Sequence, residues 1–204
     1  MIDIDKNQNS IYEVLIGDVS IKEAIYPSVQ KGVDVIPSTV DLSQAEVDLV
    51  YVDNREKVLK EALKDLRNAY DYIFIDCPPS LNLLTVNALT ASDSIIIPIQ
   101  CEYFALVGLS QLMNTVRLIK KVLNPTIEIE GVLLTMKDNR SNLVSQVGDE
   151  IKKYFGAKVY NTYIPRNIRL AESPSHGKPI LLYDNKSKGA MAYKMLADEF
   201  LSKQ

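Results

Sequence analysis

Short apolar runs alternate with amphipathic stretches along most of the chain. Five of these runs are rich in β-branched or aromatic residues and are only five to nine residues long. Runs of this length and composition are typical of strands buried in a sheet. The strands predicted in this way span residues 33–37, 72–76, 94–99, 127–135 and 159–164.

The stretches between these runs repeat their apolar residues with the period of an α-helix. In the strongest of them, residues 55–69, Leu59 and Leu63 share one face, and Asp53 or Asn54 is placed to cap the helix. The helices predicted span residues 42–50, 55–69, 83–91, 106–123, 144–155 and 191–201. Strands that alternate with helices favour parallel pairing. We therefore expect an α/β fold, with a doubly wound, mostly parallel sheet and helices on both faces.

Length and composition are ordinary for a globular protein. The chain has 204 residues, of which 47% are hydrophobic and 24% are charged. It contains no internal repeat or low-complexity linker, so we expect residues 1–204 to form a single domain. No apolar stretch approaches the length of a membrane span, and no signal peptide opens the chain. Cys77 and Cys101 lack metal-ligand spacing, so we expect reduced thiols, as in a cytoplasmic protein.

The run at 72–76 ends on an acid, Asp76, and Cys77, Pro78 and Pro79 follow at once. At the end of a parallel strand this carboxylate would face the edge where open α/β sheets bind ligands. The two prolines fix φ and remove two donors, so the chain must leave the sheet in a stiff turn. A carboxylate there can hold a Mg²⁺-bound water or orient an attacking water. The alternative is an ordinary aspartate that caps the next helix.

Five motifs stand in order along the chain and extend this pattern. They are YDYIFIDCPPSL (70–81), PIQCEYFA (98–105), EGVLLT (130–135), IPRN (164–167) and AESPSHGKPI (171–180). Over nearly the whole chain, they resemble the ParA/Soj family of chromosome- and plasmid-partitioning ATPases, which belongs to the P-loop NTPases. The resemblance implies ATP and Mg²⁺ as cofactors, and a homodimer that binds non-specific DNA. It also implies a ParB/Spo0J-like centromere-binding partner and a cytoplasmic, nucleoid-associated protein without membrane contact.

Members of this family carry a glycine-rich phosphate loop, and these 204 residues contain none. Such a loop needs a glycine, four residues and then Gly-Lys-Ser or Gly-Lys-Thr, so that backbone N–H groups wrap the phosphates. The one Gly-Lys pair is Gly177-Lys178, where Pro179 follows and Glu172 replaces the first glycine. We therefore expect a truncated family member that lacks the first strand, the phosphate loop and the first helix. Such a chain should bind ATP poorly and hydrolyse none.

Two other functions stay open at this point. The first is a non-catalytic remnant that keeps a DNA- or partner-binding surface. The second is a MinD-like division-site ATPase, a class that carries a basic amphipathic helix for membrane binding at its C-terminus. The tail at 191–201 mixes acids with bases, which indicates a packed terminal helix instead.

The resemblance also assigns residues to a nucleotide site. Asp76 would serve the catalytic step and hold Mg²⁺ through water. The loops after two later strands would border the adenine base. Their candidate residues are Met136, Pro165, Arg166 and Asn167. The residues alone also permit simpler roles, since a proline ends a strand and Asn167 can be a helix N-cap.

A dimer or switch region is implied at two further places. Pro78 and Pro79 would belong to the switch, while Gln100 and Glu102 would make polar contacts near the dimer interface. For the second pair, a plain strand-to-helix turn explains the residues equally well. Val107 stands where Soj-like sequences usually carry an acid, which bears on a surface contact and not on the fold.

Charge is unevenly distributed along the chain. The net charge is −3, which by itself argues against general affinity for nucleic acids. Residues 151–190, however, contain eight bases and two acids, so this segment carries +6 and the remainder −9. Clustered bases between loops suit contact with a phosphate backbone, although a charge run is often only a solvated face. Together with the resemblance, this predicts DNA binding by Arg169, Lys178, Lys186 and Lys188.

Overall fold

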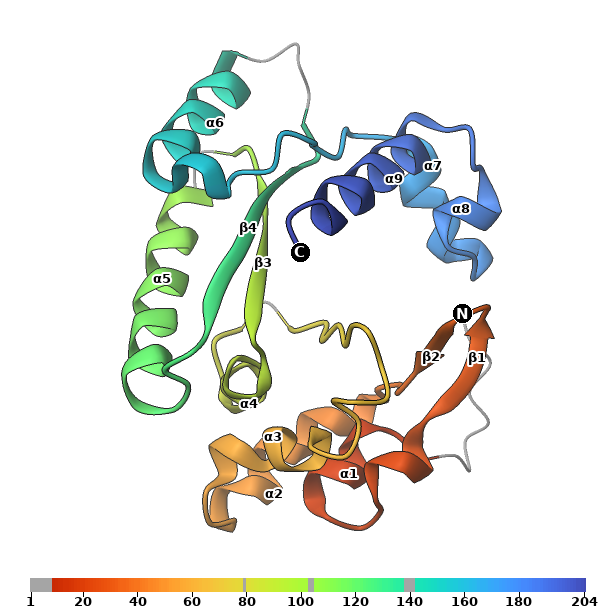
Figure 1. The fold of residues 1–204 in the computed structure, drawn as a ribbon, viewed down its shortest axis with the longest axis vertical. Coiled ribbons are helices and arrows are strands. Elements are labelled where there is room, and N and C mark those ends of the chain that lie inside the picture. Colours follow the sequence, from red (N-terminus) through yellow and green to blue (C-terminus); the bar gives the residue numbers. More distant parts are fainter. Residues whose placement is uncertain (1–8, 79, 103–104, 138–141) are drawn as a thin grey trace. The chain divides into compact units, whose positions relative to one another are not determined.

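The computed structural model of the protein describes residues 9–78, 80–102, 105–137 and 142–204 (Figure 1). The chain forms two compact units. The N-terminal unit comprises the chain up to Asp93 together with Asn114–Ile127, and the C-terminal unit comprises Ser94–Met113 together with Glu128–Gln204. Helix α5 (Ala105–Val122) contributes its first half to the C-terminal unit and its second half to the N-terminal unit.

Short helices build the N-terminal unit around an apolar core. They are α1 (Ile11–Ile16), α2 (Ala45–Asp48), α3 (Val58–Leu63) and α4 (Leu83–Ala91), with 3₁₀ turns at Ile21–Ala24, Val40–Gln44, Leu49–Tyr51 and Arg55–Lys57. A capping box starts α1, because the Glu13 carboxylate accepts hydrogen bonds from the backbone N and the Oγ of Ser10, each at 2.7 Å. The core joins α1 to α3 through Val14, Leu15, Leu59 and Leu63.

An antiparallel hairpin belongs to the same unit and joins β1 (Tyr26–Gln30) to β2 (Val33–Val35). Its connecting loop contains Gly32, which takes a positive φ of 75° that glycine adopts without strain. The sequence predicts β2 but not β1, because Pro27 and Ser28 are typical of turns rather than strands.

The C-terminal unit is built on a parallel pair of strands. Its elements are β3 (Ser94–Gln100), β4 (Glu128–Thr135), α6 (Asn142–Phe155), α7 (Ile168–Glu172), α8 (Ile180–Tyr183) and α9 (Lys188–Leu201), with 3₁₀ turns at Gly156–Lys158 and Ser173–His176. The register of the pair runs from Ser94 opposite Glu128 to Gln100 opposite Thr135. Residues 159–165 run parallel to β4 on its other side through isolated bridges.

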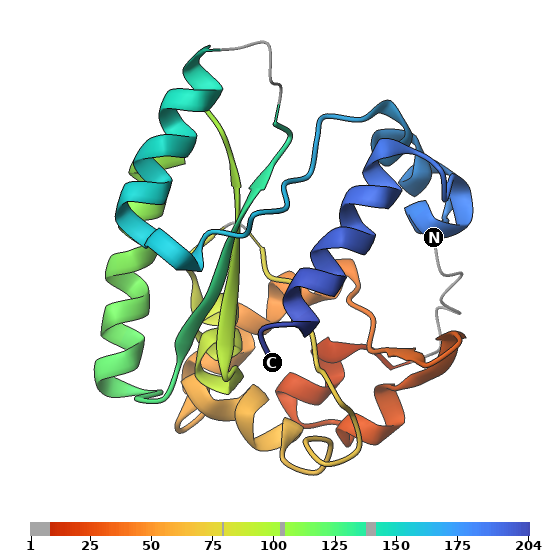
Figure 2. The ribbon, with the colours of Figure 1, turned by 45° about the horizontal axis from the view of Figure 1, so that its top comes forward.

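Helices cover both faces of this parallel pair (Figures 1 and 2). Helices α5 and α6 share an apolar cluster with Val132 and Leu134 of β4. Helix α9 shares a second cluster with Leu133, through its Ala192. Successive β4 residues thus meet different helical layers, as the two-residue period of a strand requires. The predicted α/β fold, with a parallel sheet and helices on both faces, is confirmed.

Residues 159–165 are held beside β4 by backbone hydrogen bonds, from Tyr160 to Val132 and from Ile164 to Leu134, each at 2.9 Å, and by two kinds of side-chain contact. The ring of Tyr160 occupies the space next to Gly131, where a Cβ would lie 2.3 Å from Cε2 of the ring. The Glu199 carboxylate of α9 accepts hydrogen bonds from the backbone N of Asn161 and of Thr162, each at 2.8 Å. These bonds satisfy backbone donors of a segment that has no continuous strand ladder.

The helix predictions agree best with the structure from residue 83 onward. The helix predicted at 83–91 coincides with α4, and those predicted later match α5, α6 and α9 to within three residues. The helix predicted at 55–69 is too long, because α3 ends at Leu63 and turns follow. None of the helices in the described ranges has the length and apolarity that crossing a membrane requires.

Two strand predictions need correction. The described chain has four strands, and residues 72–76 form none of them; the segment is irregular and Phe74 is 73% exposed. A strand is stable only when its backbone N–H and C=O groups form hydrogen bonds with a neighbouring strand. An apolar run in the sequence does not tell whether such a neighbouring strand is present. Residues 159–164 form isolated bridges to β4 rather than the continuous strand that the sequence predicts.

Candidate functional site

Three parallel segments of the C-terminal unit end at one edge. They are β3, β4 and residues 159–165. Beyond the end of β4, the backbone N of Lys137 donates to the carbonyl of Ile164 at 3.1 Å, and the backbone N of Arg166 donates to the carbonyl of Lys137 at 3.4 Å. The loop after β4 and the loop after residues 159–164 are therefore tied together at the edge where α/β sheets bind ligands.

This edge brings together the residues predicted to border an adenine base. Met136 is 51% exposed and has a positive φ of 49°, an unusual conformation for a residue with a Cβ. Lys137 beside it lies over the Tyr163 ring, with Nζ 4.4 Å from the centroid. Pro165 is half-buried and Arg166 is exposed. The predicted grouping of the two loops is present, and the contact with a base stays a prediction.

Asn167 has a structural role that the sequence already permitted. Its Oδ1 accepts a hydrogen bond from the backbone N of Leu170 at 3.2 Å and so caps α7. The side-chain amide N of Asn167 is still able to donate. The residue can therefore cap the helix and face a ligand, but the capping role is the one the structure shows.

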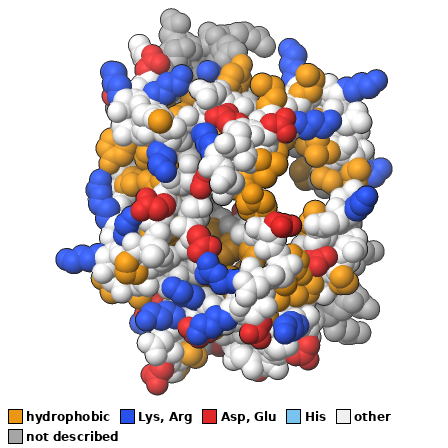
Figure 3. Space-filling model, viewed as in Figure 1, with side chains coloured by type: hydrophobic (Ala, Val, Ile, Leu, Met, Phe, Trp, Pro, Cys, Tyr) orange, Lys and Arg blue, Asp and Glu red, His pale blue; other side chains and the backbone are white. Residues whose placement is uncertain are grey.

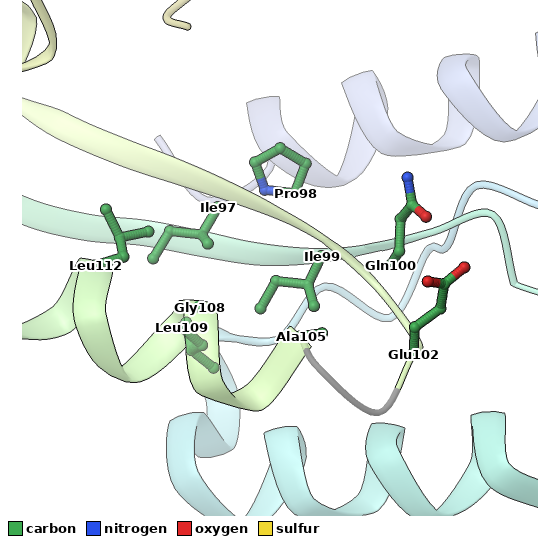
Figure 4. A pocket seen from close by; sticks show the side chains of 9 residues that line it. All are labelled: Ile97, Pro98, Ile99, Gln100, Glu102, Ala105, Gly108, Leu109 and Leu112. Carbon is green, nitrogen blue, oxygen red and sulfur yellow. The ribbon is translucent and has the colours of Figure 1, made fainter. Parts of the chain in front are cut away.

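The end of β3 borders a pocket of about 320 Å³ between this strand and α5 (Figure 4). Ile97 and Ile99 face the α5 side of the pocket, while Gln100 and Glu102 lie at its end with their polar groups directed away from the apolar part (Figure 4). Burial raises the pKa of the neighbouring Cys101 thiol, although the Lys137 cation lowers it, so the thiol stays neutral at pH 7. Both predicted dimer residues of this segment are exposed and available for polar contacts.

Asp76 lies in the N-terminal unit, in the irregular segment that was predicted to be a strand. The Asp76 side chain is exposed, as are Cys77 and Pro78, whereas Pro79 lies outside the described residues. Although Cys77 as a residue is exposed, partial desolvation of its sulfur atom, and then the Asp76 charge, raise the pKa of the thiol. Among the described residues there is no group of three carboxylate, histidine or cysteine side chains that could hold a metal ion. The catalytic and Mg²⁺-binding roles of Asp76 stay predictions.

The residues of this chain fit only part of a Mg²⁺–ATP site. The edge described above offers two tied loops that could border a base. For the phosphates, the 204 residues contain no glycine-rich loop with its lysine. For the metal, the predicted ligand Asp76 is an exposed carboxylate, and the described residues contain no group of three potential metal ligands. Backbone donors that wrap phosphates and a lysine that neutralises them cannot be replaced by one carboxylate. These residues therefore do not make up a complete site for ATP hydrolysis.

The predicted DNA-binding lysines lie on the connections between α7, α8 and α9. Lys178 precedes α8, Lys186 lies in the loop between α8 and α9, and Lys188 is the first residue of α9. All three are exposed, and no acidic side chain in the described ranges forms an ion pair with them. Figure 3 shows Lys and Arg side chains projecting from the side of the C-terminal unit where α7 and α8 lie.

The loop that carries Lys186 and Lys188 has a defined conformation. Asp184 Oδ1 accepts the backbone N–H of Lys186 at 3.2 Å, and the Ser187 hydroxyl oxygen accepts the backbone N–H of Ala190 at 3.1 Å and caps α9. Gly189 then allows close packing on α7, because a Cβ there would lie 2.5 Å from Cγ of Leu170. The loop therefore presents its lysines from a fixed backbone.

Arg169 differs from the three lysines because acidic side chains surround it. Its Nη1 lies 2.9 Å from Glu172 Oε2 and its Nε lies 3.6 Å from Asp184 Oδ2. The charge count of the segment includes these two acids but does not predict that they lie beside the arginine. The three-residue spacing of Arg169 and Glu172 on a helix was a usable signal. The approach of Asp184 depends on the fold alone.

Comparisons with known proteins identify relatives of this chain. A family model described as an AAA domain matches residues 1–129. The chain is 57% identical over 192 residues to the sporulation initiation inhibitor protein Soj of Bacillus subtilis, covering 94% of this chain and 76% of that protein. It is 52% identical over 199 residues to the chromosome partitioning protein ParA of Myxococcus xanthus, covering 98% of this chain and 70% of that protein.

A solved structure shares the fold. The cobyrinic acid a,c-diamide synthase of Mycobacterium smegmatis, crystallised with an ATP analogue and magnesium, superposes with a TM-score of 0.80 at 35% identity. The match covers 96% of this chain and 72% of that one. Its ligands show that a protein of this fold binds nucleotide and magnesium.

Proposed function

The chain belongs to the ParA/Soj family of partitioning ATPases, and on this premise we propose that its C-terminal unit contacts DNA through the loop between α8 and α9. Its function is of the ParA/Soj partitioning type. The observation that carries the proposal is the set of exposed lysines without acidic partners on a backbone fixed by Asp184 and Ser187. Lysines presented in this way can replace counterions on a phosphate backbone without breaking ion pairs first.

The DNA proposal is tested by replacing Lys186 and Lys188 together by alanine. We expect the affinity for a labelled duplex of random sequence to fall about tenfold at low salt, and the salt dependence of binding to become shallower by about two counterions. Fluorescence anisotropy titrations between about 50 and 200 mM NaCl, with ATP and Mg²⁺ in the buffer, measure both quantities.

A matched control replaces two lysines elsewhere in the protein, Lys60 and Lys64 of the N-terminal unit. This variant has the same net charge as the first. If both variants lose affinity to the same extent, the effect is one of overall charge and the assignment of the α8–α9 loop is wrong.

We further propose that residues of this chain correspond to part of the nucleotide site found in full-length members of the family. Met136, Pro165, Arg166 and Asn167 would border the base, and Asp76 would face the Mg²⁺ and water side. Gln100, Glu102, Pro78 and Pro79 would serve the dimer interface and switch. The proposed setting is a cytoplasmic, nucleoid-associated homodimer that meets a ParB/Spo0J-like partner. Support comes from the family membership and from the ATP analogue and magnesium bound by the related synthase.

We expect a polypeptide of these 204 residues to release no phosphate from ATP above the rate of its Asp76→Ala variant. The reason is the absence of a Gly-x₄-Gly-Lys-Ser/Thr sequence among these residues, because that loop supplies the donors and the lysine that neutralise phosphate charge. A coupled phosphate-release assay with DNA present measures the rate. Turnover that disappears with Asp76→Ala would show a working site and contradict this expectation.

A further inference from the structure

The three lysines and Arg169 of the basic segment meet different electrostatic surroundings. We propose that Glu172 and Asp184 restrain DNA binding by holding the Arg169 guanidinium, so that DNA phosphate must displace these carboxylates before the arginine contributes. This inference rests on the proposed DNA-binding function and adds a regulated contact to the same surface.

Both acidic residues of the basic segment lie beside the same basic side chain, that of Arg169. Residues 151–190 contain only Glu172 and Asp184 as acids, and both form ion pairs with Arg169. The hydrogen bond with Glu172 raises the pKa of Arg169, and the same bond lowers the pKa of Glu172. The arginine therefore carries its charge next to two opposite charges, while Lys178, Lys186 and Lys188 do not.

The acids are fixed in place by contacts other than Arg169. The Tyr183 hydroxyl donates to Glu172 Oε2 at 3.1 Å, and the His176 ring stacks on Tyr183 with a centroid distance of 4.9 Å. Asp184 Oδ1 accepts the backbone N–H of Lys186 at 3.2 Å. These contacts limit how far either carboxylate can withdraw from the guanidinium. Three elements meet in this cluster, namely α7, α8 and the loop that presents the lysines.

The strength of the restraint follows from solvent exposure. The side chain of Arg169 is 55% exposed and those of Glu172 and Asp184 are 40% and 35% exposed. Ion pairs this exposed are weak and screened by salt, so they can be exchanged for phosphate contacts rather than blocking them. A DNA phosphate can make a bidentate contact with the same guanidinium. We therefore expect the ion pairs of Arg169 to lower the affinity for DNA by a modest factor at low salt.

The test uses isosteric variants that remove charge and keep the acceptors. In the Glu172→Gln/Asp184→Asn double variant, an amide oxygen can still accept from Tyr183 and from the backbone of Lys186. We expect affinity for the random duplex to rise about three- to tenfold at low salt, with a salt dependence steeper by about one counterion. Anisotropy titrations measure both, and far-UV circular dichroism with thermal melts shows that the fold is kept.

A second double variant, Asp149→Asn/Asp198→Asn, controls for net charge in the same unit. Both acids are exposed and neither pairs with Arg169 in the described structure. An equal rise in this control would show that the effect is only overall charge and would overturn the inference.

The restraint must also act through Arg169. In an Arg169→Ala background, the Glu172→Gln/Asp184→Asn substitutions are expected to raise affinity no more than the control pair does. A full rise without the arginine contradicts the inference, as does a loss of affinity in the parent double variant. These outcomes differ from failure of the proposed function, in which the Lys186/Lys188 variant itself binds DNA normally.

Discussion

Replacing Gly131 by alanine is expected to lower the free energy of unfolding by about 3 kcal/mol or to prevent folding of the C-terminal unit. The added Cβ would lie 2.3 Å from Cε2 and 2.8 Å from Cζ of Tyr160. The Tyr160 ring is rigid and 2% exposed, so it has no free space into which to move. The overlap must push residues 159–165 away from β4. Urea denaturation followed by circular dichroism measures the loss.

Gly148→Ala is the matched control within the same unit. A Cβ at Gly148 would meet only Cδ1 of Leu134, at an ordinary contact distance of 3.7 Å. Because Gly148 lies inside α6, the alanine should be neutral or should stabilise by up to about 1 kcal/mol.

Tyr160 provides a second test of the cause. Its hydroxyl is buried and has no hydrogen-bond partner among the described residues, and the Lys203 ammonium lies over the ring, with Nζ 4.2 Å from the ring centroid. Combining Gly131→Ala with Tyr160→Leu should recover part of the lost stability, because the ring atoms that clash are removed. A Gly131→Ala protein as stable as wild type would show that the close packing of Gly131 and Tyr160 is not a constraint.

Replacing Glu199 by glutamine is expected to lower the free energy of unfolding by about 2 kcal/mol at pH 7. The carboxylate accepts from the backbone N of Asn161 and of Thr162, each at 2.8 Å, and lies 3.4 Å from Lys203 Nζ. Glutamine keeps one acceptor oxygen but loses the charge that strengthens these bonds. Urea denaturation of both proteins at several pH values measures the difference.

The pH dependence follows from the Glu199 pKa. Burial is the largest influence and raises it, but the backbone hydrogen bonds and Lys203 together bring the pKa below its ordinary value of 4.5. A lowered pKa means that the charged form is stabilised by folding. Its contribution is therefore complete above pH 4.5 and is lost as the pH falls through the folded-state pKa.

The stability difference between wild type and Glu199→Gln should accordingly shrink as the pH falls below 4.5. Asp198→Asn is the control, since this neighbouring acid is exposed and should show little difference at any pH. A Glu199→Gln difference that stays constant down to pH 3 would mean that the carboxylate charge has no part in holding residues 161–162.

Elements that carry their own local signal were predictable from the sequence. Asn82 caps α4 through its side chain, and the predicted helix 83–91 has the bounds of α4. The strands predicted at 94–99 and 127–135 correspond to β3 and β4 within one residue at each end. In these places apolar pattern, cap and neighbouring strand all favour the same structure, and such agreement makes a prediction reliable.

The candidate site was predictable only in part, for a reason that Asp76 and Arg169 illustrate. Asp76 was placed at a strand end from its apolar run and its prolines, but the run is not a strand in the structure. Arg169 was placed in a basic surface from the charge count, but its two acidic neighbours are three and fifteen residues away. The sequence pattern of a segment indicates its preferred secondary structure. Whether a strand or a charged side chain finds a partner depends on which residues the fold brings close to it.

The sequence by itself determined the family, the α/β class and the order of the elements around β3 and β4, because motifs and periodicity are properties of neighbouring residues. Tertiary structure alone decided that residues 72–76 form no strand, how Glu199 and Gly131 hold residues 159–165, and that Asp184 lies beside Arg169. These are contacts between residues far apart in the chain or on different elements. Their energies depend on distance and burial, which exist only once the chain has folded.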